Sequence, residues 1–239
     1  MARKKSYGQF CPVAQAAEIV AERWTPLILR ELISGSHRFS DLRRGVPLMS
    51  PSLLSQRLKE LEDAGVVQRQ PAETGAGSEY YLTEAGQHLR PVIEMLGLWG
   101  HRWVTREIRR EELDPALLMW DIRRRSDAAG MPSDQRVAVQ FDLDGVPLKK
   151  SRWWLVFDRG DVDLCLKSPG YDVDLHVASH IRDLVDVWLG HTKIREAIRE
   201  EKMRLDGSRK MIRSFKDWFG LSVFAHLRIE DIGAQLRAD

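Results

Sequence analysis

Four polar side chains recur at helical spacing between residues 52 and 59. Ser52, Ser55, Gln56 and Lys59 fall on one side of a helical wheel. Their hydroxyl, amide and ammonium groups can form hydrogen bonds with base edges and phosphate oxygens, and Gln and Lys can pair with adenine and guanine. These residue types at this spacing predict a helix surface that contacts double-stranded DNA.

More cations flank this surface in the sequence. Arg43 and Arg44 lie just upstream, where contacts with phosphates would set the register of the protein on a duplex. Arg69 lies downstream, whereas Glu79 would repel a nearby phosphate, so we expect that downstream segment to contribute modestly. The full set of candidate DNA contacts is Arg38, Ser40, Arg43, Arg44, Ser50, Ser52, Ser55, Gln56, Arg57, Lys59 and Arg69.

The helix that must hold this surface is predicted over residues 51–64. Ser50 is a favourable N-cap, Pro51 suits the first helical position, and Gly65 suits the position after the last turn. Leucines at positions 54, 58 and 61 form an apolar stripe on the side opposite the polar residues. This stripe would hold the helix against a core and leave its polar side facing outward.

The neighbouring segments predict a winged helix-turn-helix. A short helix over residues 40–45 precedes the polar helix, and strands over residues 66–70 and 78–83 follow it around a loop from Glu73 to Ser78. In this layout the helix enters the major groove and the hairpin lies on the backbone of the duplex. The alternative is a winged helix that serves only protein contacts, in which case the same charges are a solvated face.

Helical patterns also flank the predicted wing. Pro12 and Pro26 indicate the starts of helices over residues 12–23 and 25–33. After the hairpin, Thr83 caps a long fifth helix whose apolar residues continue to Trp103. Pro91 falls inside this pattern and should kink the helix.

Seven motifs in this half closely resemble those of HxlR-type winged-helix transcriptional regulators. The resemblance covers residues 8 to 104 and implies a bacterial homodimer that binds a pseudo-palindromic DNA operator. It also implies that the first and fifth helices form the dimer contact. The motifs are Cys11–Val13, Arg23–Thr25, Leu27–Leu32, Arg38–Arg44, Ser50–Leu58, Leu61–Val67 and Tyr80–Gly86.

The pattern changes from helical to alternating after residue 135. Four segments alternate apolar with polar residues, around residues 137–143, 153–157, 162–166 and 173–177. Amphipathic helices are predicted over residues 179–190, 192–199 and 208–219. The expected fold is α+β, with an antiparallel sheet covered by helices. We divide the chain into a winged-helix DNA-binding and dimerisation domain (1–104), a helical connector (105–134) and a second domain (135–239).

Residues 135 to 220 resemble, more weakly, the sterol-carrier-protein-like fold, in which a sheet and its helices enclose an apolar tunnel. The resemblance implies a hydrophobic ligand that modulates DNA binding. The alternative is that the same side chains fill a solid core. The candidate pocket residues are Val139, Phe141, Trp153, Leu155, Phe157, Leu164, Leu175, Trp188 and Phe215.

Composition limits the classes of function. The 239 residues carry a net charge of only +2, so a DNA-binding surface must come from local charge. We find no catalytic triad, phosphate-binding glycine loop or dinucleotide motif, so we expect neither an enzyme nor a cofactor. His176 and His180 have a spacing that binds metal on a helix, but a strand is predicted to end between them. No metal site is therefore expected. No apolar run approaches the length of a membrane span, so no membrane association is expected either.

Two cysteines far apart in the sequence, Cys11 and Cys165, indicate free thiols in a reducing cytoplasm. Cys11 precedes a helix and has Arg3, Lys4 and Lys5 nearby in sequence, and both features favour a reactive thiolate. Cys11 is therefore a candidate redox sensor, with a small buried residue at the dimer contact as the alternative.

The patterns together predict a sequence-specific DNA-binding transcriptional regulator. We expect it to be a repressor whose affinity for DNA responds to a hydrophobic ligand in the second domain. The alternative is a carrier of lipids or other hydrophobic ligands, or a small enzyme, with the winged helix used only for dimerisation.

Overall fold

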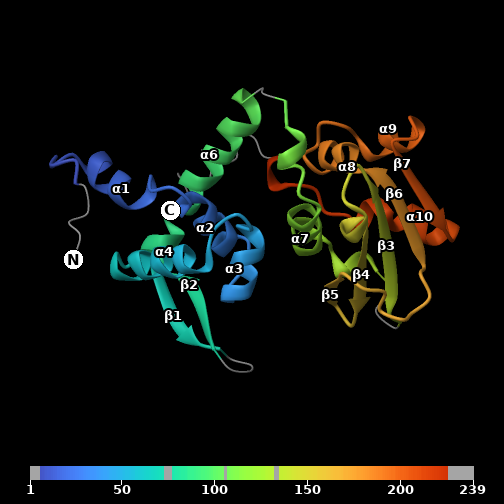
Figure 1. Ribbon diagram of the computed structural model, residues 1–239, viewed down its shortest axis with the longest axis horizontal. Coiled ribbons are helices and arrows are strands. Elements are labelled where there is room, and N and C mark those ends of the chain that lie inside the picture. Colours follow the sequence, from blue (N-terminus) through green and yellow to red (C-terminus); the bar gives the residue numbers. More distant parts are fainter. Residues whose placement is uncertain (1–5, 73–76, 105–106, 132–134, 226–239) are drawn as a thin grey trace. The chain divides into compact units, whose positions relative to one another are not determined.

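A computed structural model describes residues 6–72, 77–104, 107–131 and 135–225 (Figure 1). Arg3, Lys4, Lys5 and most of the expected wing loop therefore lie outside the described residues, as do the last residues of the second predicted domain. The chain divides into two compact units, with the boundary between Gly100 and His101, near the end of helix α6 (Arg90–Trp103).

The first unit contains helices, then a hairpin, then helices (Figure 1). Strands β1 and β2 pair antiparallel from Val67↔Leu82 to Pro71↔Ser78. This order gives the winged helix-turn-helix predicted from the sequence. The elements are α1 (Pro12–Val20), α2 (Thr25–Ile33), α3 (Phe39–Gly45), α4 (Pro51–Asp63), β1 (Val67–Pro71), β2 (Ser78–Leu82), α5 (Glu84–Gln87) and α6 (Arg90–Trp103).

Two helix boundaries in this unit differ from the predictions. The first helix ends at Val20 rather than Arg23, because Trp24 adopts a left-handed conformation (φ 78°) that turns the chain before α2. The expected fifth helix is two helices, α5 and α6. Pro91 lies in the first turn of α6, where its missing N–H is harmless; inside one continuous helix its ring would clash with a preceding carbonyl.

The second unit is built on a five-stranded sheet with the order β5-β4-β3-β6-β7. It confirms the α+β class. The strands are β3 (Val137–Asp144), β4 (Arg152–Asp158), β5 (Asp161–Cys165), β6 (Leu175–His180) and β7 (Met203–Gly207). The helices are α7 (Pro115–Arg125), α8 (Ile181–Trp188), α9 (Ile194–Arg199) and α10 (Arg209–Trp218), with short 3₁₀ turns at Arg110–Glu112, Ala128–Gly130, Leu148–Lys150 and Val223–Ala225.

The expectation of a purely antiparallel sheet was wrong at one pairing. Three pairings are antiparallel, but β3 and β6 run parallel, with Val139 opposite Leu175 and Phe141 opposite Val177. The chain leaves β5 at one edge of the sheet and crosses to the far side of β3. Alternating apolar residues indicate which face of a strand is buried but not which way the strand runs.

The segment predicted as a connector contributes to the second core. Leu118, Met119 and Ile122 of α7 are buried against the sheet together with residues of α8 and α10. Arg123 Nε also donates a hydrogen bond to the carbonyl of Val162 on β5, over 2.7 Å. Helix α7 therefore belongs to the second unit, and its apolar face shows why it cannot be a free linker.

Candidate nucleic-acid interface

Helix α4 is oriented by its apolar side. Leu54, Leu58 and Leu61 are at most 2% exposed, and they pack in the core of the first unit. The Ser50 hydroxyl caps the helix by accepting a hydrogen bond from the Leu53 N–H over 3.3 Å. The polar side that the sequence singled out is consequently exposed. It consists of Ser52, Ser55, Gln56 and Lys59.

Acidic neighbours hold two of these exposed groups. Gln56 Nε2 donates to Glu60 Oε1 over 3.1 Å. Lys59 Nζ lies 2.9 Å from Asp63 and 3.3 Å from Glu62, and these hydrogen bonds raise the pKa of the ammonium group. Lys59 therefore stays cationic. Ion pairs this exposed contribute little to stability, so a phosphate or base can displace the carboxylates at small cost.

Arg57 does not share this exposed surface. Its side chain is 15% exposed, and its guanidinium binds Glu60 at 2.5 Å and Glu22 at 2.8 Å. Because Glu22 lies between α1 and α2, this arginine fastens α4 to the preceding helices. These contacts favour a role of Arg57 in positioning α4 over its predicted role as a DNA contact.

The cations upstream of α4 lie on or next to α3. Arg43 is exposed and forms no ion pair with any residue in the described ranges. Arg44 is 3.3 Å from Asp41, and the Ser40 hydroxyl also faces that carboxylate at 3.5 Å. Arg43 is thus the α3 cation most available to a phosphate.

The carboxylate of Glu79 in the wing is paired with hydrogen-bond donors, so it repels phosphate less than the sequence suggests. Glu79 is buried and accepts hydrogen bonds from the Tyr81 hydroxyl (2.6 Å) and Arg38 Nε (3.2 Å). The hydrogen bond from Tyr81, followed by that from Arg38, holds the pKa of Glu79 below its usual value. Its expected repulsion of phosphate is therefore largely cancelled. Arg38 joins the wing to the start of α3, and Arg69 is exposed on β1.

A buried carboxylate that sequence reasoning missed, Glu31, sets the approach of α3 to α2 through its partly exposed partner Arg30. Glu31 is completely buried and binds Arg30 Nη2 at 2.8 Å and the Ser36 hydroxyl at 3.3 Å. Arg30 also donates to the carbonyl of Gly45 at the end of α3, over 2.9 Å. A side chain at Gly45 would collide with the Glu31 carboxylate. The signal in the sequence is a charged pair inside an otherwise apolar helix.

Comparison with known proteins agrees with this geometry. A family model described as the HxlR-like helix-turn-helix matches residues 19–108. The HTH-type transcriptional regulator YvaP of Bacillus subtilis is 40% identical over 98 residues, which are 40% of this chain and 91% of YvaP. The chain belongs to the HxlR-like helix-turn-helix family.

Further relatives cover a similar share of this HxlR-like protein. The B. subtilis transcriptional regulator YodB is 35% identical over 39% of this chain and 85% of YodB. The solved structure of its reduced form is 31% identical over 41% of this chain and 97% of that chain, with a TM-score of 0.36. A model of the SCP-2 sterol transfer family matches residues 124–220, which lie beyond the residues that the HxlR-like model matches.

The candidate pocket residues of this second part fill a core. Seven of the nine are buried in one hydrophobic cluster, while Leu164 and Trp188 pack against its surface. Edge-to-face contacts of Trp218 with Phe157 and Phe215, at centroid distances of 5.2 and 5.0 Å, close this cluster. The alternative of a solid core therefore describes these side chains, and of the nine only Phe215 also lines one of the hollows described next.

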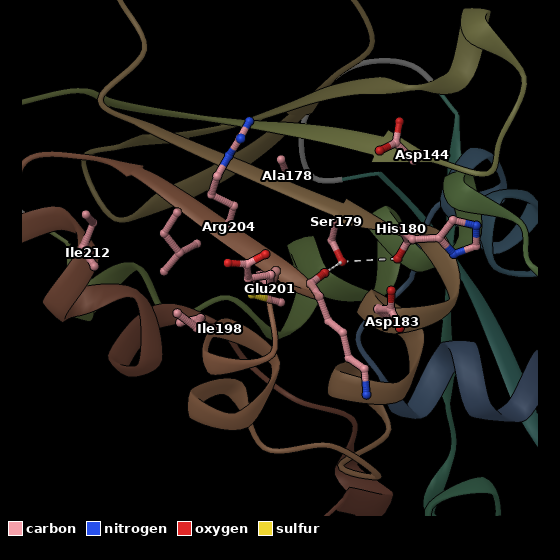
Figure 2. A pocket seen from close by; sticks show the side chains of 12 residues that line it. Asp144, Ala178, Ser179, His180, Asp183, Ile198, Glu201, Arg204 and Ile212 are labelled. Atoms are coloured by element: carbon pink, nitrogen blue, oxygen red, sulfur yellow. Dashed lines mark hydrogen bonds between the residues drawn. The ribbon is translucent and has the colours of Figure 1, made fainter.

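Two hollows lie at the outer side of this unit, where α9, β7 and α10 meet. One, of about 670 Å³, has Ile198 and Ile212 at one end and His180 and Asp183 at the other (Figure 2). The second, of about 780 Å³, lies between α9 and α10. Both are lined by Ile198, Leu205 and Ile212, so the two hollows share an apolar wall.

The remaining candidates carry little chemistry. Cys11 precedes α1, is half-buried, and makes no capping hydrogen bond; both it and Cys165 are free thiols. Within the described ranges, no group of three or more His, Cys, Asp or Glu side chains is placed to hold a metal ion. In the same ranges, no helix has the length and apolar character needed to cross a membrane.

Proposed function

We propose that this HxlR-like protein is a cytoplasmic, sequence-specific DNA-binding repressor. The observation that carries the proposal is the exposed polar side of α4, which three buried leucines hold outward. Ser52, Gln56 and Lys59 would contact base edges in the major groove, and Arg43 would contact phosphates. A protein seated on a promoter in this way excludes polymerase from it, which requires no further contact with the transcription machinery.

The proposed active form is a homodimer. Large apolar side chains near α1 and along α6 are exposed, including Phe10 (96%), Val13 (75%) and Trp99 (58%), with Val92 and Leu96 beside them on α6. Soluble proteins rarely leave so many large apolar side chains exposed, so we expect a second copy of the chain to bury them. A dimer would present two α4 helices to successive major grooves, which matches a pseudo-palindromic operator.

A gel shift with the DNA immediately upstream of the protein's own gene tests this proposal. The purified chain should retard that DNA at protein concentrations at which a scrambled fragment of equal length stays free. Raising the salt concentration should weaken binding, because cations on the protein release counterions from the duplex. Equal retardation of both fragments would instead favour an electrostatic, sequence-independent interaction.

The second unit supports a further element of the proposal, a hydrophobic effector that changes the affinity for DNA. The match to the SCP-2 sterol transfer family and the hollows beside α9 and α10 support it. Melting the protein with fatty acids, sterols or aromatic acids should reveal a ligand as an increase in melting temperature. An alternative is a carrier in which the winged helix only dimerises; such a protein would bind ligand but show no sequence preference in the gel shift.

A further inference from the structure

The segment from α9 to α10 carries an excess of positive charge. Residues 194–218, from the start of α9 to the end of α10, contain eight Lys or Arg and five Asp or Glu, an excess of three positive charges, whereas the whole chain has a net charge of +2. The rest of the chain is therefore slightly acidic. A concentration of cations this local, beside a hollow, indicates a preference for an anionic occupant.

Three cations on the rim of the larger hollow are available to such an occupant. Arg195 of α9 and Lys210 and Arg213 of α10 line it, all three are exposed, and none forms an ion pair with any described residue. By contrast, Lys216 on the same rim is 3.7 Å from Asp217. Arginine forks are well suited to carboxylate and phosphate groups.

The floor of the same hollow is apolar. Ile194, Ile198, Leu205, Ile212 and Phe215 line it, and Ile198 and Ile212 remain more than one third exposed. Exposed isoleucines under a cationic rim are of no use to a purely polar anion such as a nucleic-acid backbone. They suit a ligand that joins a hydrocarbon chain to an anionic head.

The adjoining hollow sets the direction in which such a ligand would lie. Its far end carries the carboxylates of Asp144 and Asp183, whereas its near end is formed by the isoleucines that both hollows share (Figure 2). Asp144 and Asp183 disfavour a negative head at the first end, although Lys202 and Arg204 also line this hollow. The Arg195 and Arg213 rim, which has no ion pair with a described residue, attracts the head. The hydrocarbon chain would then cross the shared wall of Ile198, Leu205 and Ile212.

We propose that the groove between α9 and α10 binds an anionic amphiphile, with its head on Arg195, Lys210 and Arg213 and its chain on Ile198, Leu205 and Ile212. The site is on the outside of the unit, not among the side chains between the sheet and its helices, which pack as a solid core. The role of this groove as an effector site rests on the proposed regulatory function. Its ability to bind an amphiphile does not depend on that function.

Calorimetric titration of the full-length protein with matched ligands, each below its micellar concentration, tests the site. Dodecanoate, dodecanol and dodecyltrimethylammonium share one chain and differ in the charge of the head. Dodecanoate should bind about tenfold more tightly than dodecanol, and the cationic ligand should bind least. Equal binding of the three, or no binding of dodecanoate, would overturn the proposal.

Variants locate the site. A double R195Q/R213Q substitution should lower dodecanoate affinity about tenfold, to the level of dodecanol, without changing dodecanol binding. The matched control is K167Q, an exposed lysine outside the groove that has no ion pair with a described residue. I212S should weaken dodecanoate and dodecanol alike, about fivefold. Wild-type dodecanoate affinity in R195Q/R213Q would place the ligand elsewhere and refute the proposal.

A second readout separates this site from the proposed regulation. Gel shifts of the operator fragment with and without dodecanoate report the effector role, whereas calorimetry needs no DNA. A protein that binds dodecanoate through Arg195 and Arg213 but keeps its DNA affinity has the site and lacks the regulation. Regulation by dodecanoate that survives R195Q/R213Q would contradict the site and leave the regulator intact.

Discussion

At the scale of single residues, Glu31 is the charge whose surroundings matter most to the winged helix. Its carboxylate is buried between Arg30 and Ser36 and lies where a side chain at Gly45 would be. A buried carboxylate is tolerated only when its partners are complete. Arg30 in turn binds the end of α3. One ion pair therefore holds the angle between the two helices that precede α4.

Replacing Glu31 by alanine should destabilise the first unit by about 1–3 kcal/mol, because the partly exposed Arg30 and the buried Ser36 hydroxyl would lose the carboxylate that they share. Hydrogen exchange of the α2 and α3 amides, resolved by mass spectrometry, measures this loss separately from the second unit. Glu62→Ala is the control, since Glu62 makes only an exposed contact with Lys59. Equal exchange in the two variants would show that the buried carboxylate contributes nothing.

DNA contacts of α4 and α3 should differ in kind. Gln56→Ala should relax base preference by about 1–3 kcal/mol at one position in each half-site, because an amide pairs with a base edge. Arg43→Ala should weaken all sequences alike and flatten the salt dependence, because it removes a phosphate contact. Binding assays on single-base operator variants at several salt concentrations distinguish the two. Identical behaviour of both variants would contradict the assignment of α4 as the reading helix.

Glu79 should make the stability of the wing depend on pH. Its pKa in the folded protein lies below its usual value of 4.5, so its ionised form stabilises the fold above that pH. This contribution disappears as the pH falls through the folded-state pKa. Glu79→Gln should therefore speed hydrogen exchange of β1 and β2 at pH 7, after correction for intrinsic rates, and should match the wild type once the pH has fallen below the folded-state pKa. A difference that does not shrink as the pH falls would point to packing, not charge.

At the scale of elements, most helices were predictable and two features were not. The position of α4 followed from Ser50, Pro51 and the leucine stripe, because capping and periodicity are local. The burial of Glu79 was not predictable, because its partner Arg38 is far away in sequence and meets it only when the hairpin packs beside α3. The low exposure of the Arg57 side chain likewise depends on an ion pair with Glu22, which lies in another segment of the chain.

Helix α6 supports a prediction about assembly. Leu96→Glu would put a carboxylate into the apolar surface that we assign to the dimer contact, so the dimer dissociation constant should rise at least about tenfold. Sedimentation velocity over a range of concentrations measures it. Gln87→Glu, which adds the same charge at an exposed position of α5, should leave assembly unchanged. Unaltered assembly in Leu96→Glu would exclude this face from the interface.

At the scale of the whole molecule, the sequence predicted two α-and-β parts but not the full path of the second. Alternating residues such as Val139 and Phe141 identified strands and their buried face. They could not reveal that β3 pairs in parallel with β6, because strand direction depends on a connection whose course leaves no periodic signal. The apolar face of α7 was visible in Leu118 and Ile122, but the core it joins lies in strands further along the chain.

The parallel pairing of β3 with β6 has a consequence for the order of events during synthesis. Val139 meets Leu175 only after a whole hairpin has been made between them, so the middle of that sheet stays incomplete while the ribosome adds those residues. The winged helix closes mainly over short sequence distances and can be finished much earlier. The nascent chain should thus carry a folded winged helix before the sheet of its second unit is complete.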